Sequence, residues 1–120
     1  MVLGMTSAAA TPHPLPPSLL ELVAQRFRVL GEPARIRLLD ALRDGEASVR
    51  DLERATGLGQ QNVSKHLGVL LQAGIVSRRR EGNFSIYAIA DESVFDLCDL
   101  VCGGLRRQAS ELGAIVGVPA

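Results

Sequence analysis

The sequence predicts a mainly α-helical domain with one small β-hairpin. Three observations support this fold class: apolar residues recur at steps of three and four along most of the chain, two short helical stretches flank a glycine-bearing turn, and two β-rich segments flank "EGN". At 120 residues with 47% hydrophobic content, the chain can form one domain with a core but is too short for two ordinary ones.

Residues 18–112 are expected to form this domain, because both ends of the chain lack a strong pattern. Residues 1–17, "MVLGMTSAAATPHPLPP", contain four prolines and no charged side chain, so we expect a disordered N-terminal tail. The lone His13 in this tail is expected to be exposed. Residues 113–120 are expected to fray.

Two helices are predicted first. Ser18 suits the N-cap of a helix that ends by Gly31, and Pro33 suits the first turn of a second helix that ends near Gly45. The expected apolar stripe of the first helix consists of Leu19, Leu20, Val23, Phe27 and Leu30. The expected buried side of the second consists of Ile36, Leu38, Leu39 and Leu42.

The next two helices form a helix-turn-helix pattern. Ser48 with Asp51 resembles a capping box, and Gly57 ends this helix before a Leu58-Gly59 turn. Its expected inward residues are Val49, Leu52 and Ala55, and those of the following helix are Val63, Leu67, Leu70 and Leu71. The polar face of the second helix consists of Gln60, Gln61, Asn62, Ser64, Lys65 and His66. Such a pair offers the polar N-terminal part of its second helix to the DNA major groove.

A hairpin and a last helix complete the pattern. Residues 75–80, "IVSRRR", and 84–89, "FSIYAI", are rich in β-formers, and "EGN" between them supplies a turn. A helix-turn-helix followed by such a hairpin is therefore the predicted order of elements. The apolar side of the last helix is expected to consist of Val94, Phe95, Cys98, Val101, Cys102, Leu105 and Leu112.

Charge is distributed unevenly although the net charge is zero. Residues 48–90 contain six basic and three acidic side chains, whereas residues 91–120 contain two basic and five acidic ones. The basic middle and acidic end are expected if only the middle meets phosphates. Aromatic residues make up 3% of the chain, which argues against stacking of single-stranded bases.

Several other function classes are also disfavoured. No run approaches the roughly 18 apolar residues of a membrane span. Two closely spaced cysteines do not make a secreted disulfide framework, so we expect a cytoplasmic protein with reduced thiols. No Ser/His/Asp set, phosphate-cradling glycine loop or complete metal site is visible, so we expect no enzymatic activity.

Candidate DNA contacts lie on the second helix of the pair and on the hairpin. Glutamine and asparagine can pair with adenine, whereas Lys65 and His66 can contact guanine or phosphates. Arginines near a wing tip can enter a minor groove, or they can simply protect an edge strand from aggregation. Strand alternation turns Arg79 away from Arg78 and Arg80. The candidates are Gln60, Gln61, Asn62, Ser64, Lys65, His66, Arg78, Arg80 and Asn83.

Cys98 and Cys102 allow two interpretations. Their spacing places the thiols side by side on a helix, which suits a thiophilic metal or metalloid ion but not an internal disulfide. Two ligands are too few for such an ion, so others would come from Asp96, Asp99, His13, solvent or a partner subunit. Alternatively, both cysteines pack as small apolar residues.

The sequence resembles the ArsR/SmtB family of bacterial winged helix-turn-helix repressors over about residues 20–110. The matching segments are "LGEPARIRLLDAL" and "VRDLERATGLGQQNVSKHLGVLLQAGIVSRRREGNFSIYAIAD". The resemblance implies a homodimer joined by the first and last helices, which binds a palindromic operator and represses a gene until an inducer acts. Wide apolar stripes on those two helices independently fit a dimer seam.

The sequence departs from the family pattern at three places. Gly59 stands where a serine cap is common, and it is a weaker but permitted N-cap. "SVRDLERATG" lacks the family's cysteine cluster, and residues 91–115 lack the histidines that bind zinc in other members. The inducer therefore stays open: it is a thiophilic metal or thiol-reactive compound at the last helix, or the cysteines are structural. A winged-helix protein-interaction module is the alternative function.

Overall fold

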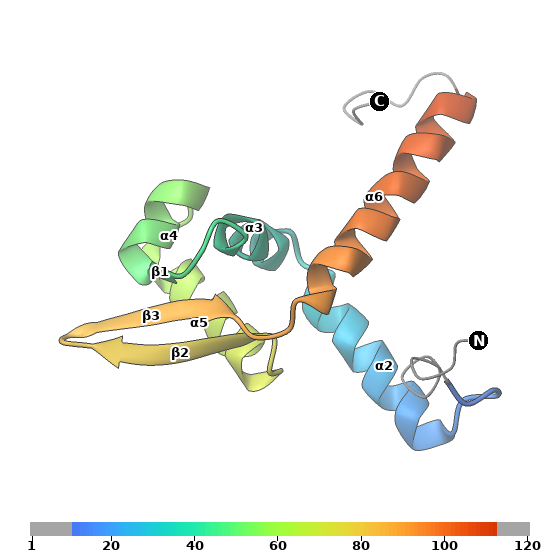
Figure 1. Ribbon diagram of the computed structural model, residues 1–120, viewed down its shortest axis with the longest axis horizontal. Helices are drawn as coiled ribbons and strands as arrows, with labels where there is room; N and C mark the ends of the chain where they lie inside the picture. Colours follow the sequence, from blue (N-terminus) through green and yellow to red (C-terminus); the bar gives the residue numbers. More distant parts are fainter. Residues whose placement is uncertain (1–10, 113–120) are drawn as a thin grey trace, which may run out of the picture.

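The structure, a computed structural model, describes residues 11–112, and within them the chain folds as a winged helix-turn-helix. The helices are α2 (Pro17–Leu30), α3 (Pro33–Leu42), α4 (Val49–Thr56), α5 (Gln60–Gln72) and α6 (Ser93–Leu112), and the strands are β1 (Ala47–Ser48), β2 (Val76–Glu81) and β3 (Phe84–Ile89). Figure 1 shows two parts. Helices α3, α4 and α5 and the sheet, residues 33–89, gather in one body, which we call the head. Helices α2 and α6, which we call the arms, extend from it in diverging directions.

Residues 1–10 of the expected disordered tail and residues 113–120, which were expected to fray, lie outside the described residues, and residues 11–16 contain no helix or strand. Ser18 is not the N-cap of α2: Pro16 takes that place and Pro17 begins the helix. A proline in the first turn needs no cap for its missing N–H, so the helix starts two residues earlier than expected. The end at Gly31 is confirmed, since its N–H donates to the Phe27 carbonyl at 2.8 Å.

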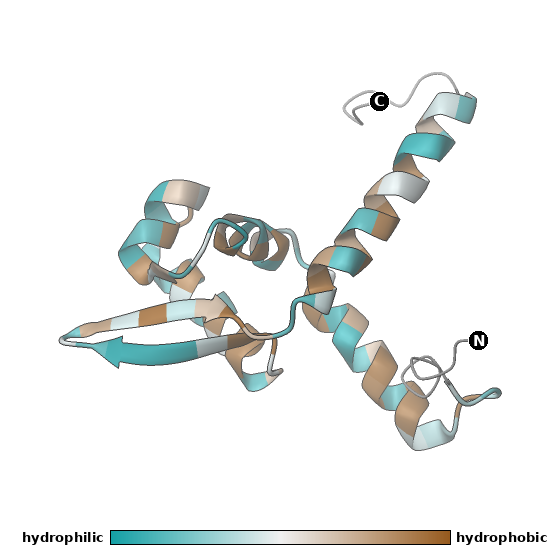
Figure 2. Ribbon diagram, viewed as in Figure 1, coloured by the Kyte–Doolittle hydropathy of each residue, from teal (hydrophilic) through white to brown (hydrophobic). Residues whose placement is uncertain are grey.

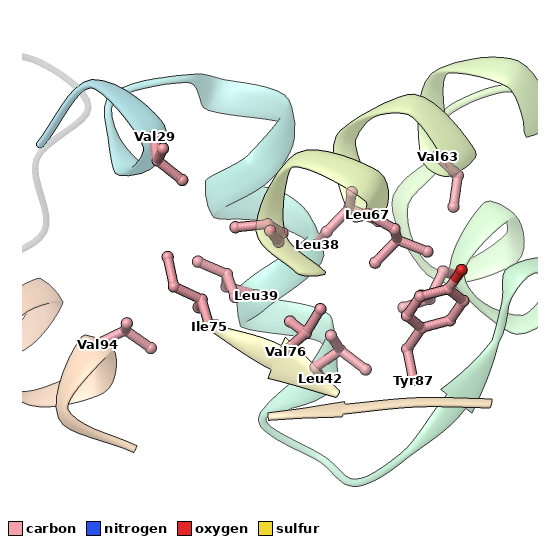
Figure 3. Packing of buried hydrophobic residues seen from close by; sticks show 12 residues of the cluster. Val29, Leu38, Leu39, Leu42, Val63, Leu67, Ile75, Val76, Tyr87 and Val94 are labelled. Atoms are coloured by element: carbon pink, nitrogen blue, oxygen red, sulfur yellow. The ribbon is translucent and has the colours of Figure 1, made fainter. Parts of the chain in front are cut away.

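One apolar core lies inside the head and reaches the base of both arms. Figure 3 shows its side chains pointing toward one another from the helices and the sheet. Most leucines of α3, α4 and α5 are almost completely buried, as expected for helices whose apolar residues recur every three to four positions, and Leu71 is half-buried. The buried apolar residues are Val29, Leu38, Leu39, Leu42, Leu52, Val63, Leu67, Leu70, Ile75, Val76, Tyr87 and Val94.

Two residues expected in this core are exposed instead. Ile36 is 44% exposed, because Leu38, Leu39 and Leu42 set the direction of α3 and Ile36 falls to the side that faces α6. Ala55 is also exposed, and Thr56 is buried in its place. The Thr56 hydroxyl donates to the Leu52 carbonyl at 2.6 Å and accepts from the Leu58 N–H at 3.2 Å. A satisfied hydroxyl is thus buried where an apolar methyl was expected.

The helix-turn-helix forms as the sequence indicates. The Ser48 hydroxyl accepts from the Asp51 N–H at 3.1 Å and the Asp51 carboxylate accepts from the Ser48 N–H at 3.1 Å, so the capping box is confirmed. Gly57 ends α4 at φ 78°, in the left-handed region that favours glycine. Gly59 is the N-cap of α5 without a side-chain cap. The first N–H groups of α5 therefore lack a side-chain acceptor at Gly59.

The hairpin belongs to a three-stranded antiparallel sheet of order β1-β3-β2. Strand β1 was not expected from the sequence, because two residues are too few to show alternation. Glu81 pairs directly with Phe84, so the connection is two residues long rather than the three expected. Only Gly82 of these two has positive φ, at 62°, which is the pattern of a type II′ turn.

The arms present apolar side chains to the outside. Figure 2 shows hydrophobic residues along the lengths of both α2 and α6, away from the head. Among the side chains of the arms that the structure describes, only Val29 and Val94, at the base of each arm, are buried. The large exposed apolar residues of the arms are Leu20, Leu22, Phe27, Leu100, Val101 and Leu105. The arms therefore have apolar faces that this chain does not cover by itself.

Candidate nucleic-acid interface

Helix α5 has one buried face and one exposed polar face. Val63, Leu67 and Leu70 are 0% exposed and fix the helix in the core. Their spacing turns the intervening polar residues outward. Five of the six expected polar residues are exposed at the N-terminal half of the helix: Gln60, Gln61, Asn62, Ser64 and Lys65.

His66, the sixth candidate, was placed wrongly on this exposed face. It is 7% exposed, and its Nδ1 lies 3.0 Å from Nη1 of Arg35 on α3. The reason is geometric: His66 lies three residues after Val63 and next to Leu67, so it shares their inward side. Burial lowers the pKa of the His66 imidazole, opposed by Glu32 and reinforced by the positive charges of Arg35 and Lys65.

The wing divides its arginines between two faces, as the alternation predicts. Arg78 pairs in register with buried Tyr87 and Arg80 with Ser85, so both lie on the face of the hairpin that covers the core. Arg79 is on the opposite face, where Nη2 donates to Glu46 at 2.5 Å and Nη1 to Glu81 at 2.8 Å. These carboxylates raise the pKa of Arg79. Arg79 is thus held in surface ion pairs, whereas Arg78 and Arg80 have none among the described residues.

A polar groove joins the wing tip to the start of the helix-turn-helix. It has a volume of about 430 Å³, and Asn83 and Gln60 are the two sequence candidates that lie in it. Arg50 and Phe84 were not among those candidates, although Phe84 is 61% exposed. Arg50 could have been found from the sequence, because it is a basic residue in the first turn of the first helix of the helix-turn-helix. The lining residues are Ser48, Val49, Arg50, Glu53, Gln60, Asn83, Phe84 and Ser85.

The two cysteines lie beside a second groove, between α3 and α6. Cys98 is half-buried and Cys102 is exposed, and both are free thiols. The groove has a volume of about 450 Å³ and also contains Asp99 and Arg43. The Arg43 guanidinium stacks over the Phe95 ring at 4.3 Å and lies 3.6 Å from the Asp99 carboxylate. Burial raises the pKa of the Cys98 thiol, against the opposing charge of Arg43.

The donor set around the cysteines is incomplete for a metal within one chain. Among residues 11–112, no group of three or more histidine, cysteine or acidic side chains could hold a metal ion. His13 is exposed in the segment before α2 and does not line this groove. The two thiols therefore give only a partial set of ligands, which a thiophilic ion would have to complete from solvent or another chain.

Comparison with known proteins gives one consistent family. Residues 32–78 match the model described as "Bacterial regulatory protein, arsR family". The HTH-type transcriptional regulator Rv0081 of Mycobacterium tuberculosis is 39% identical over 99 residues, which cover 82% of this chain and 87% of that protein. Its crystal structure matches this one with a TM-score of 0.72 and 40% identity, covering 80% of this chain and 97% of that chain.

Two further similar proteins have informative descriptions. A Mycobacterium bovis protein, Mb0332, is described by its solution structure as a homodimeric winged helix-turn-helix DNA-binding domain. It is 30% identical with a TM-score of 0.68, covering 92% of this chain and 93% of that chain. A probable mercury resistance operon repressor of Streptomyces lividans is 36% identical over 99 residues, which cover 82% of this chain and 79% of that protein.

Proposed function

Since this chain belongs to the ArsR family of bacterial regulatory proteins, we propose that it is a homodimeric repressor that binds a palindromic operator in double-stranded DNA. The observation that supports this most strongly is the exposed polar half of α5 on a helix fixed by its buried face. In a helix-turn-helix, this part of the second helix reaches base edges in the major groove. The proposed contacts are Gln60, Gln61, Asn62, Ser64, Lys65, Arg78, Arg80 and Asn83, without His66.

The arms support the homodimer. Their uncovered apolar side chains lie on α2 and α6, and a second copy of the chain would cover them with the same residues. The similar Mb0332 domain is described as homodimeric. A two-fold pair of heads predicts half-sites about one helical turn, roughly 10 base pairs, apart.

DNA binding is tested with the full chain and a duplex from the region upstream of its own gene, beside a shuffled duplex. We expect preference for the upstream duplex and a strong decrease in affinity with salt, about a thousandfold between 50 and 200 mM for six or more phosphate contacts. Absence of binding to any duplex at low salt would favour the interaction module instead. The measurement is fluorescence anisotropy of labelled duplex.

Cys98 and Cys102 support a second, narrower proposal, that a thiophilic metal, metalloid or thiol-reactive compound releases the DNA. Both thiols line one groove next to Asp99, at the point where arm α6 meets α3 of the head. Since burial raises the pKa of Cys98, a bound metal would have to displace its proton. A similar protein is described as a probable mercury resistance operon repressor.

The sensor is tested by comparing the wild type with Cys98→Ser/Cys102→Ser in the same anisotropy assay. With Hg²⁺ or arsenite, the wild type is expected to release DNA and the double variant to stay bound. Release through these thiols would change the position of the arms relative to the head. A wild type that stays bound with every ion and oxidant leaves the cysteines as packing residues.

The family also limits other functions. Its described relatives are transcriptional regulators, so we propose no catalytic activity for this chain. None of the helices in residues 11–112 combines the length and the apolar character needed to cross a membrane. We propose the cytoplasm as its location, because the operator DNA of a bacterium lies there.

A further inference from the structure

Arg35 joins three elements of the molecule. From the first turns of α3, its Nε donates to the Val29 carbonyl at 2.6 Å and its Nη2 to the Arg28 carbonyl at 3.4 Å. These carbonyls belong to the last turn of α2, where a helix leaves its C=O groups without internal partners. The remaining nitrogen of the guanidinium, Nη1, lies 3.0 Å from His66 Nδ1 on α5. One side chain thus connects the end of arm α2 to the middle of α5.

The chemistry of this contact fixes the state of His66. An arginine guanidinium has only N–H donors and stays charged, so Nδ1 of His66 must be the acceptor. His66 is therefore neutral, with its proton on Nε2. Protonation would place the second proton of the ring on Nδ1, where it would face the Arg35 N–H, and would bring two positive charges together.

The surroundings of His66 favour this neutral form. Arg35 faces it from α3 and Lys65 is its neighbour on α5, and both oppose a positive charge. Glu32 at the N-cap of α3 acts in the other direction, but its carboxylate already accepts from the Ala34 N–H at 2.7 Å. Burial is the largest influence and lowers the pKa of His66.

A second arginine connects the same arm to the other end of α5. Arg26 of α2 donates through Nη2 to the carbonyl of Ala73, the C-cap of α5, at 3.2 Å. Its Nη1 lies 3.3 Å from Asp91, just before α6. Helix α5 is therefore held to α2 at its middle, through His66 and Arg35, and at its C-terminal end, through Ala73 and Arg26.

We propose that Arg35 and His66 are positioning residues for DNA binding: their hydrogen bond sets α5 against arm α2, and protonation of His66 breaks it. This inference rests on the proposed DNA-binding function. If α2 lies at the dimer seam, the bond also sets how the two α5 helices of a dimer are placed for their half-sites. The repressor is then weakened by acid through one side chain that touches no DNA.

The test uses the full chain with His13→Ala, because the chain has only two histidines and this change leaves His66 as the only one. In this background, His66→Asn keeps an acceptor near the position of Nδ1 but cannot titrate, and His66→Leu removes the acceptor. Affinity for the upstream duplex is measured by anisotropy from pH 7.5 to 5.5 at constant salt. Circular dichroism at each pH confirms that the protein remains folded.

The parent is expected to lose affinity over this range by less than about tenfold, because the lowered pKa of His66 leaves part of the imidazole neutral at pH 5.5. His66→Asn is expected to bind like the parent at pH 7.5 and to keep that affinity at pH 5.5. His66→Leu is expected to bind weakly at both. If His66→Leu does not fold, the comparison of the parent with His66→Asn decides alone.

Two results would overturn the proposal, and they are distinguishable. Equal pH profiles for the parent and His66→Asn would show that the His66 bond does not position α5, while the DNA-binding function stands. A parent that binds no duplex at pH 7.5 would remove the DNA-binding function and the inference with it. Nitrogen-15 spectra of the histidine ring provide an independent readout, since a proton on Nδ1 at neutral pH contradicts the geometry.

Discussion

The head and the arms place their apolar side chains in opposite ways. In the head, Leu38, Leu67 and Leu70 are completely buried, and the helices and sheet cover one another. On the arms, Leu22 and Leu100 are 68% and 73% exposed. A monomer therefore gains little burial energy from these side chains. The head is thus complete within one chain, whereas the arms require a second surface.

The largest effect is expected when charge is introduced on the apolar face of α6, because this face is proposed to bind the second chain. Val101→Glu/Leu105→Glu places two carboxylates on the same side of the helix. We expect a monomer by sedimentation velocity and loss of binding to a two-site duplex, with the circular dichroism of the head retained. Ser110→Glu, on another side of α6, is the control and should remain dimeric. A dimeric double variant would contradict the role of this face.

Leucine truncation compares the two regions directly in that monomeric variant, where unfolding does not depend on concentration. Leu67→Ala is expected to lower the free energy of unfolding by about 2–5 kcal/mol, because it removes a fully buried side chain. Leu100→Ala, at an exposed position, is expected to change it by less than about 0.5 kcal/mol. Urea unfolding measures both, and similar losses would show that the arm is packed against its own head.

A smaller effect, on DNA affinity, is expected for substitutions in the wing. Arg80 and Arg79 form a matched pair for this test. Arg80→Ala should weaken operator binding and reduce the slope of log affinity against log salt by about 1, if Arg80 contacts a phosphate. Arg79→Ala removes the same charge from the opposite face, where Glu46 and Glu81 already occupy the guanidinium. We expect a smaller change in the salt slope for Arg79→Ala. Equal slopes would indicate that the wing acts only through its total charge.

The smallest effect is expected at the cap of α4. Ser48→Ala removes one half of the capping box and should cost about 1 kcal/mol of unfolding free energy. Hydrogen bonds from Ser48 lower the pKa of Asp51, so this carboxylate stabilises the fold when ionised. Its contribution is therefore present above pH 4, about the ordinary Asp value, and is lost as the pH falls through the lowered pKa. Urea unfolding of both proteins at pH 7 and pH 3 should show the difference shrinking in acid.

The sequence predicted the winged helix-turn-helix fold because its signals are local. Glycines, the Ser48 cap and the three-to-four-residue apolar spacing each act within a few residues. The capping box and the helix ends at Gly31 and Gly57 were confirmed, whereas α3 ends at Leu42, before the expected Gly45. Strand β1 was missed because it forms only through its pairing with β3, which is distant in the sequence: Ala47 pairs with Tyr87, 40 residues away, and Ser48 pairs with Ile86, 38 residues away.

The candidate site was less predictable, because polarity does not report direction in space. His66 is polar and was assigned to the exposed face, but a partner from α3, Arg35, satisfies it in the interior. For the same reason, Thr56 is buried where Ala55 was expected, because the Thr56 hydroxyl donates to the Leu52 carbonyl. The groove beside the cysteines could not be predicted either, because it forms between α3 and α6, which are far apart in the sequence. A partner chain would change its lining.

The central proposal, that two chains use their arms to place two heads on one operator, is tested most directly by the composition of the protein–DNA complex. Native mass spectrometry of the full chain with the upstream duplex measures it. Two chains per duplex are expected, together with loss of that complex when either half-site is replaced or when α6 contains Val101→Glu/Leu105→Glu. A stable complex of one chain per duplex, unchanged by those substitutions, would contradict the proposal.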